Sequence, residues 1–183
     1  MMIMSIMRIA LSFLLFLSCS VSADTYDHLL LRAQASIFPK IVLLDQGLNK
    51  KTPDDEIVLN IVSSKRDAYI AQQLKKSIED KYGSSLGNKK LTVSITTFEE
   101  FNETTLATAY IVLQSSESLI KKVVAYASRH ERIVFSYSYS NFIYDALISL
   151  HVKEKAYVYL NKSAIQLYGI EFLPVFYKIT KII

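Results

Sequence analysis

The chain has 183 residues, a length that suits one domain once a short N-terminal leader is set aside. Its 21 basic and 17 acidic residues leave a formal charge of +4, and the lysine pairs are scattered along the chain. A nucleic-acid-binding surface needs a denser basic patch. Composition therefore argues against a partner of nucleic acid and against a second domain.

The first two dozen residues have the pattern of a secretory signal peptide. Arg8 precedes the apolar run 9–17, and small residues follow in a Val-x-Ala ending at Ala23. The run is shorter than the roughly 20 apolar residues that a bilayer-spanning helix needs. We expect cleavage after Ala23, which leaves 183 − 23 = 160 residues of an exported, periplasmic domain. A lipid anchor on Cys19 is the alternative, which Phe16 disfavours because leucine is usual three positions before that cysteine.

The predicted mature chain opens with a helix, a loop and a strand. Apolar residues at helical spacing predict a helix over 27–37 that Pro39 ends. The polar stretch 46–55 predicts a loop, and the β-branched run 57–62 predicts a buried strand.

A second helix follows that strand directly. Ser64 and Asp67 have the spacing of a capping box with a shorter acid. Gly83 supplies the stop at the other end. The face that this helix is expected to bury contains Ala71, Leu74, Ile78 and Tyr82.

Strands and helices continue to alternate toward the middle of the chain. The runs 91–95 and 109–113 predict the second and third strands, and 132–135 predicts a fourth. Between the last two, a helix begins after the serine pair 115–116. Its inward face is expected to contain Leu119, Ile120, Val123, Val124 and Ala127.

The tail of the chain has a different rhythm. The apolar runs 146–152 and 156–160 flank a charged turn and predict a β-hairpin. Asn161 is expected to cap a short helix that Gly169 ends. The segment 173–182 predicts a C-terminal helix with a proline in its first turn.

Together these elements predict the fold class. Strands that alternate with amphipathic helices form βαβ units, and such units build a mainly parallel sheet with helices on both faces. The hairpin adds an antiparallel edge. The sequence therefore predicts a three-layer α/β fold.

Residues that could carry catalysis are sparse. The histidines His28, His130 and His151 lie far apart and lack the paired spacing of metal ligands. Ser118 and Lys121 match the S-x-x-K of penicillin-interacting enzymes, but the companion motifs K-T-G and S-D-N do not occur. The 4 glycines form no nucleotide-binding loop and no G-x-S-x-G nucleophile motif, and the predicted mature chain contains no cysteine. We therefore expect a non-enzymatic protein without metal or cofactor.

Serine-rich segments follow three of the predicted strands. In open α/β sheets, ligands bind outside the carboxyl ends of the parallel strands, where helix N-termini offer free N–H groups. Hydroxyls and N–H groups there favour a small polar or anionic ligand. The alternative is that these serines only cap helices. The candidate ligand-binding residues are Ser63, Ser64, Lys65, Ser115, Ser116 and Ser136.

The stretch 137–144 alternates tyrosine with serine. Tyrosine is favoured at the centre of protein interfaces, so an exposed loop of this composition is a candidate partner surface. The alternative is that its aromatic side chains pack across the end of the sheet as core. The candidate partner-binding residues are Tyr137, Tyr139, Phe142 and Tyr144.

The tail also carries a family resemblance. An apolar strand ending in Ile148-Ser-Leu-His-Val152 is followed by a charged turn and Val158-Tyr-Leu-Asn161. A short helix, Gly169-Ile-Glu-Phe-Leu-Pro174 and the closing segment 175–182 complete the order. This order resembles the C-terminal signature of the YfiR-like periplasmic proteins. The resemblance extends over about residues 26–183.

That resemblance implies a Rossmann-like α/β domain in the periplasm of Gram-negative bacteria. The best-known member of the family represses a membrane-bound diguanylate cyclase, which makes cyclic-di-GMP, by binding its periplasmic part. Other members resemble accessory sensors beside membrane histidine kinases or GGDEF receptors. This chain departs from the family in its lack of mature cysteines and in having 37–45 where an aromatic segment is usual.

Two functional hypotheses follow. The first is a non-enzymatic periplasmic signalling regulator that binds the periplasmic part of a membrane diguanylate cyclase or histidine kinase. The second is a periplasmic solute-binding module that captures a small polar or anionic ligand in the serine-lined crevice. Fold alone does not separate them. A homodimer is a further assembly to consider, because symmetric dimers are the commonest.

Overall fold

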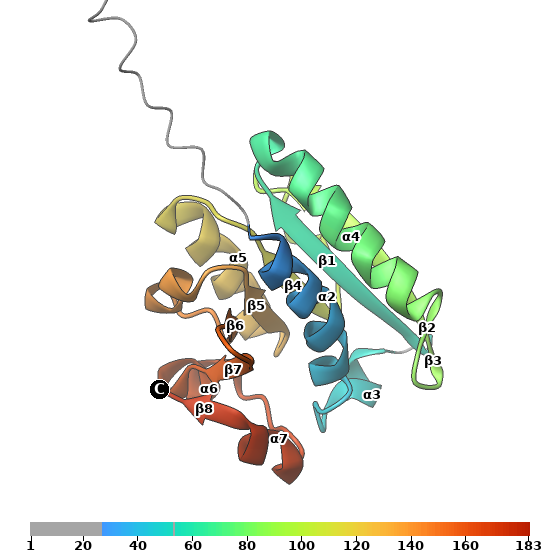
Figure 1. The fold of residues 1–183 in the computed structure, drawn as a ribbon, viewed down its shortest axis with the longest axis vertical. Helices are drawn as coiled ribbons and strands as arrows, with labels where there is room; N and C mark the ends of the chain where they lie inside the picture. Colours follow the sequence, from blue (N-terminus) through green and yellow to red (C-terminus); the bar gives the residue numbers. More distant parts are fainter. Residues whose placement is uncertain (1–26, 53) are drawn as a thin grey trace, which may run out of the picture.

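The computed structural model describes residues 27–52 and 54–183. The predicted signal peptide, with Cys19, lies outside the described residues. The described chain forms one eight-stranded sheet in the order β2-β3-β1-β4-β5-β6-β7-β8, with helices on both faces (Figure 1). This confirms the predicted α/β class. Within the described part of the chain, no helix combines the length and the apolar character needed to cross a membrane.

Five parallel strands form the centre of the sheet, in the spatial order β3-β1-β4-β5-β6. The second strand of the chain therefore lies on one side of the first, and all later parallel strands lie on the other. The direction of winding reverses between β1 and β4, and this reversal is the position where open α/β sheets bind ligands. The five strands are β1 (Glu56–Ser63), β3 (Lys89–Thr97), β4 (Ala109–Val112), β5 (Ile133–Ser136) and β6 (Ile148–Val152).

Helices cover the two faces of the sheet in pairs. Phe38 of α2 stacks on Phe135 of β5 with ring centroids 4.4 Å apart. Tyr126 of α5 packs edge-on against Tyr110 of β4 on the other face, at 6.2 Å. Two helices, α2 (His28–Val42) and α4 (Ala68–Tyr82), therefore share one layer, and α5 (Glu117–Arg129) and α6 (Lys162–Tyr168) share the opposite one.

The N-terminal helix runs past the proline that was expected to end it. Pro39 lies inside α2, which continues to Val42. The proline stands in the last turn, so the helix loses only the hydrogen bond that a residue-39 N–H would have donated. Phe38, Ile41 and Val42 are all buried, and their packing outweighs that loss.

The predicted loop 46–55 contains one short helix, α3 (Leu48–Lys51). Beside it, Lys51 Nζ lies 2.7 Å from Asp45 Oδ2, and both side chains are buried. Asp45 also accepts a hydrogen bond from the N–H of Gly47 at 2.8 Å. The ion pair fixes the chain as it enters β1, and the prediction of an irregular loop was incomplete because this contact is tertiary.

The tail contains the predicted hairpin but ends as a strand. β6 pairs antiparallel with β7 (Ala156–Leu160), and β8 (Thr180–Ile182) then adds to β7 in parallel. The predicted helix 173–182 is therefore wrong at its end, because α7 stops at Ile179 and its first residue is Pro174. The open edge of β7 offers backbone partners, and the N–H of Ile183 bonds the carbonyl of Leu160 at 3.1 Å. The hairpin is thus inside the sheet and β8 is the edge.

Two connections differ from a regular βαβ pattern. The short strand β2 (Ser85–Leu86) forms an antiparallel hairpin with β3. Residues 98–108, all of them described, link β3 to β4 without a helix. Phe98 and Phe101 anchor this segment in the core with only 1% of their surface exposed. The chain leaving β3 is therefore held against the carboxyl ends of the central strands.

Replacing Phe38 by alanine tests the packing of α2 on the sheet. Because the ring is fully buried, we expect the free energy of unfolding to fall by about 3–5 kcal/mol. Leu29→Ala is the control, since this side chain in the first turn of the same helix is 67% exposed and should cost less than about 0.5 kcal/mol. Urea denaturation followed by circular dichroism measures both. Equal losses would contradict the assignment of this face of α2 to the core.

Candidate functional site

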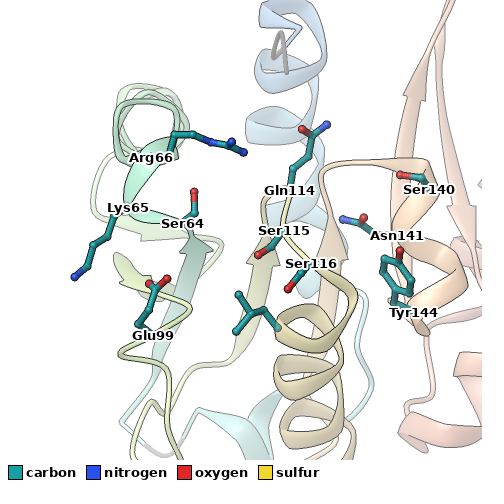
Figure 2. Close-up of a pocket in the computed structure, with 11 residues that line it drawn as sticks. Ser64, Lys65, Arg66, Glu99, Gln114, Ser115, Ser116, Ser140, Asn141 and Tyr144 are labelled. Carbon is teal, nitrogen blue, oxygen red and sulfur yellow. The ribbon is translucent and has the colours of Figure 1, made fainter. Parts of the chain in front are cut away.

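A pocket of about 680 Å³ opens at the carboxyl ends of the central strands. It lies at the winding reversal between β1 and β4, and segments after β1, β3, β4 and β5 form its walls (Figure 2). Its lining is mostly polar and contains two cations and one acid. The lining residues are Ser64, Lys65, Arg66, Glu99, Gln114, Ser115, Ser116, Leu119, Ser140, Asn141 and Tyr144.

One wall is the turn that starts α4. The Ser64 hydroxyl donates to Asp67 Oδ2 at 2.6 Å and accepts from the Asp67 N–H at 3.3 Å. This contact confirms the Ser64 cap of the predicted box, with the Asp67 carboxylate bonded to the Ser64 hydroxyl, and closes the 3₁₀ turn η1 (Lys65–Asp67). Lys65 and Arg66 are exposed, and Figure 2 shows Arg66 extending toward Gln114 across the pocket. The Ser64 hydroxyl is therefore engaged in capping. This wall adds two positive charges to the pocket, and that of Arg66 lies beside Asp67, with Nε 3.9 Å from Oδ1.

The facing wall is the N-terminus of α5. Ser116 occupies the N-cap position, yet within the described chain its side chain makes no capping hydrogen bond to the helix. Its hydroxyl lies 3.2 Å from that of Ser118 instead. The first-turn N–H groups of α5 therefore face the pocket without a side-chain acceptor, and they carry the positive end of the helix dipole.

The acid in the first turn of α5 is already paired. Lys121 Nζ donates to Glu117 Oε1 at 2.6 Å, and this hydrogen bond raises the pKa of Lys121 above its ordinary value. Both side chains are about half exposed, so the pair adds little to stability. It does direct the Glu117 carboxylate along the helix, which leaves the helix N-terminus open.

The third wall is the 3₁₀ segment η2 (Tyr139–Tyr144). Asn141, with 5% of its surface exposed, lines the pocket from this segment. Its amide nitrogen is buried and has no hydrogen-bond partner among the described residues. Figure 2 shows this amide on the side of η2 that faces Ser115 and Ser116. A buried donor without an acceptor is costly, so this site is one where an acceptor from a ligand would be favourable.

The pocket brings together four of the six predicted ligand-binding residues, namely Ser64, Lys65, Ser115 and Ser116. The other two do not line it. Ser63 ends β1 with 1% of its surface exposed, and Ser136 ends β5 fully buried, its hydroxyl donating to the carbonyl of Ser138 at 2.7 Å. Both are the last residues of strands, and they face the interior because their side chains follow the strand's alternation.

Sequence reasoning did not single out several of the pocket residues. Glu99 follows β3, which extends to Thr97 and so two residues beyond its predicted end. The rule that placed serines at strand ends would have found Glu99 if that strand had been given its full length. Asn141 was also missed as a ligand-binding residue, because its place in the pocket wall depends on the conformation of the segment that follows β5.

The aromatic stretch 137–144 divides between core and surface. Tyr137 is buried, and its hydroxyl accepts from the N–H of Asp27 at 2.7 Å. Burial raises the pKa of Tyr137 above its ordinary value, although that hydrogen bond acts in the opposite direction. Phe142 is also buried, Tyr144 is half-buried in the pocket wall, and Tyr139 is 48% exposed. Of the four predicted partner-binding residues, only Tyr139 has a largely accessible side chain.

Among the described residues, no three histidine, cysteine or acidic side chains cluster in a way that could hold a metal ion. The chemistry available in the pocket is therefore that of hydroxyls, amides, backbone N–H groups and the charges of Lys65, Arg66 and Glu99. Such groups bind and orient a solute.

Comparison with known proteins gives structural neighbours only. No protein-family model matches the chain, and no curated protein matches it. A crystal structure of a conserved domain protein from Vibrio cholerae O1 biovar El Tor is similar with a TM-score of 0.58 and 12% identity, covering 83% of this chain and 59% of that one. The ABC domain in complex with L-Trp from Streptococcus pneumonia is similar with a TM-score of 0.52 and 13% identity, covering 79% of this chain and 60% of that one.

The chain thus spans less than two thirds of the length of either neighbour. At these identities the likeness shows the fold alone, since one fold supports many unrelated functions. Both neighbours support the assignment of an α/β domain.

Alanine replacement of the two strand-end serines separates their roles. We expect Ser64→Ala to lower the free energy of unfolding by about 1 kcal/mol, because it removes the cap on η1, the turn that leads into α4. Ser116→Ala should cost only a few tenths of a kcal/mol, on the order of an ordinary surface substitution, because this hydroxyl caps no amide. Thermal and urea unfolding of both variants measures the difference. An equal loss of unfolding free energy in Ser116→Ala and Ser64→Ala would contradict the conclusion that Ser116 does not cap α5.

Proposed function

We propose that this domain is a non-enzymatic binding module for a small polar or anionic solute, held in the pocket between β1 and β4. The observation that carries the proposal is the location of this pocket. It lies at the winding reversal of the sheet, where the starts of two helices meet and where doubly wound folds bind their ligands. Its volume of about 680 Å³ lies in the range of small-molecule sites.

The charges of the lining support the anionic class. Lys65 and Arg66 lie on one wall and the positive end of α5 on the other, while Glu99 is the one acid among the lining residues. Fixed positive potential in a cleft raises the local concentration of anions and their rate of entry. A small anion, or a solute with an anionic group, is thus favoured over a cation.

One structural neighbour offers a parallel for the size of the ligand. The Streptococcus pneumonia domain was solved in complex with L-Trp, a solute of amino-acid size. The parallel supports capture of a small molecule by an α/β domain of this kind. The identity of the ligand here is argued from the pocket itself, because the two chains share only 13% identity.

The proposal places the domain in the periplasm. The support is the sequence pattern of residues 8–23, which has the charge, apolar run and small-residue ending of a secretory signal peptide. A periplasmic binding module meets solutes that have crossed the outer membrane. Its output would be the occupied or empty state of the pocket.

A second candidate function is docking on the periplasmic part of a membrane signalling receptor, either a diguanylate cyclase or a histidine kinase. The observation that favours it is an apolar surface at the C-terminal end of the described chain. Seven of the twelve exposed large hydrophobic side chains among the described residues fall within 167–183. Exposed apolar side chains that are numerous in one region, rather than scattered singly, are typical of interaction sites. We call these seven the C-terminal patch: Leu167, Leu173, Val175, Tyr177, Ile179, Ile182 and Ile183.

The two candidates use different surfaces. Figure 1 shows α7 at the opposite end of the sheet from the carboxyl end of β1, beside which the pocket opens. A solute and a receptor could therefore occupy the protein together. Substitutions can also be designed that remove one activity and leave the other.

Filling the pocket with a bulky side chain tests the solute-binding proposal. Ser140 is exposed and lines the pocket, so Ser140→Trp should block it with little effect on the fold. Calorimetry and thermal unfolding with separate panels of amino acids, carboxylates, sugars and inorganic anions should give a saturable stabilisation of the unsubstituted protein. At a ligand concentration of 100 times Kd, the gain is about 2.7 kcal/mol. Ser140→Trp should lose it, and Ser163→Trp, an exposed site on α6 outside the pocket, should retain it. No stabilisation by any panel would overturn the proposal.

A charge placed in the C-terminal patch tests the docking candidate. Ile179 is 60% exposed on α7, so Ile179→Asp should leave stability nearly unchanged while removing apolar contact area. In-cell crosslinking of the tagged protein should recover a membrane diguanylate cyclase or histidine kinase. We expect the yield to fall at least tenfold for Ile179→Asp and to be unchanged for Leu29→Asp, an exposed apolar site on α2. Equal recovery with both variants would exclude this patch.

A further inference from the structure

The N-terminus of α5 differs from those of α2 and α6 in how its amides are satisfied. Asp27 accepts from two first-turn N–H groups of α2, and Asn161 does the same for α6 at 3.0 and 3.2 Å. Ser64 caps the turn that leads into α4. At α5 the N-cap side chain of Ser116 accepts nothing from the helix, as is also true of Asp67 at α4, and the start of α5 faces the pocket.

Asn141 gives a second and independent indication of a ligand at this point. Its side chain is held in place, since the residue is 95% buried and its N–H donates to the carbonyl of Ser138 at 3.2 Å. The amide nitrogen nevertheless has no acceptor among the described residues. The N-terminus of α5 and the side chain of Asn141, which belong to two different elements, therefore line the same pocket (Figure 2).

The surrounding residues favour a carboxylate over a phosphate. The nucleotide-binding loops that hold phosphate at a helix N-terminus use glycine to let the backbone approach closely, and the segment 114–117 contains none. Glu117 in the first turn and Glu99 on another wall also oppose a second negative charge. A carboxylate has one charge and two acceptor oxygens in a plane, which suits a few N–H groups and one side-chain amide.

We propose that the pocket binds the carboxylate group of its solute at this point, with the first-turn N–H groups of α5 and the Asn141 amide nitrogen as donors. The inference rests on the proposed function and names the chemical class of the ligand. One end of the solute is fixed by neutral donors in the helix dipole, while Lys65 and Arg66 attract the anion from outside. The rest of the solute then lies toward Leu119, Tyr144 or the opposite wall, and the solute's structure decides which.

The test uses acetate as the probe and backbone amide NMR as the readout. ¹⁵N-labelled protein is titrated with sodium acetate, with sodium chloride at the same ionic strength as reference. We expect saturable shifts confined to the amides of residues 117–119 and to the side chain of Asn141. Asn141→Leu keeps the volume and removes the donor, so acetate affinity should fall about tenfold or more while the fold is kept. Asn49→Leu, an exposed asparagine on α3, is the matched control and should leave the affinity unchanged.

The outcomes separate this inference from the function on which it rests. Saturable acetate shifts that Asn141→Leu removes would support both. Inorganic phosphate or glycerol binding the α5 amides more tightly than acetate would overturn the carboxylate assignment and leave a solute-binding pocket. Acetate shifts unchanged in Asn141→Leu would overturn the role of Asn141. If no probe shifts pocket amides and no panel solute stabilises the protein, the proposed function fails with it.

Discussion

The parallel pairing of β1 with both of its neighbours is the constraint on which the rest of the structure depends. Leu59 pairs with Val93 of β3 on one side and with Ala109 of β4 on the other, and all three are buried. A strand with a parallel neighbour on each side cannot continue into a tight hairpin. The chain must return along a crossover connection, which here contains the helix α4. The crossover from β1 leads to β3 on one side, and the crossover from β4 leads to β5 on the other. The pocket lies between the starts of these two connections.

The helix N-termini differ in whether a side chain caps them. Side-chain caps satisfy α2, α6 and the turn before α4, which stabilises those helices and consumes their anion-binding capacity. α5 keeps its capacity because Ser116 turns toward Ser118. A chain with only 4 glycines thus places a helix N-terminus at the pocket without a glycine-rich loop. The cost is a buried donor on Asn141 and an uncapped helix, both at the same place.

Sequence patterns correctly predicted the features that depend on residues close together in the chain. The central strands and the Ser64–Asp67 cap follow from β-branched runs and capping spacing, and both were found. Features set by distant contacts were missed. The helix continues through Pro39 because its last turn is buried, and β8 forms because β7 has an open edge. In the site, Ser115 and Ser116 were predictable from strand ends. The split of 137–144 was not, because Tyr137 is held by the backbone of Asp27, 110 residues earlier.

The η2 segment lies where the two proposed activities would have to meet. Ser140, Asn141 and Tyr144 of this segment line the pocket, while the ring of Tyr139 packs edge-on against Tyr159 of β7 at 5.3 Å. Lys181 of β8 lies over the Tyr159 ring at 5.8 Å, and its neighbour Ile182 belongs to the C-terminal patch. Contact alone is no proof of coupling, because a ligand shifts a receptor only if it binds two states of this path with different affinity. If a solute that accepts from Asn141 favours one conformation of η2, a receptor that prefers the same conformation tightens solute binding by the same factor, by linkage.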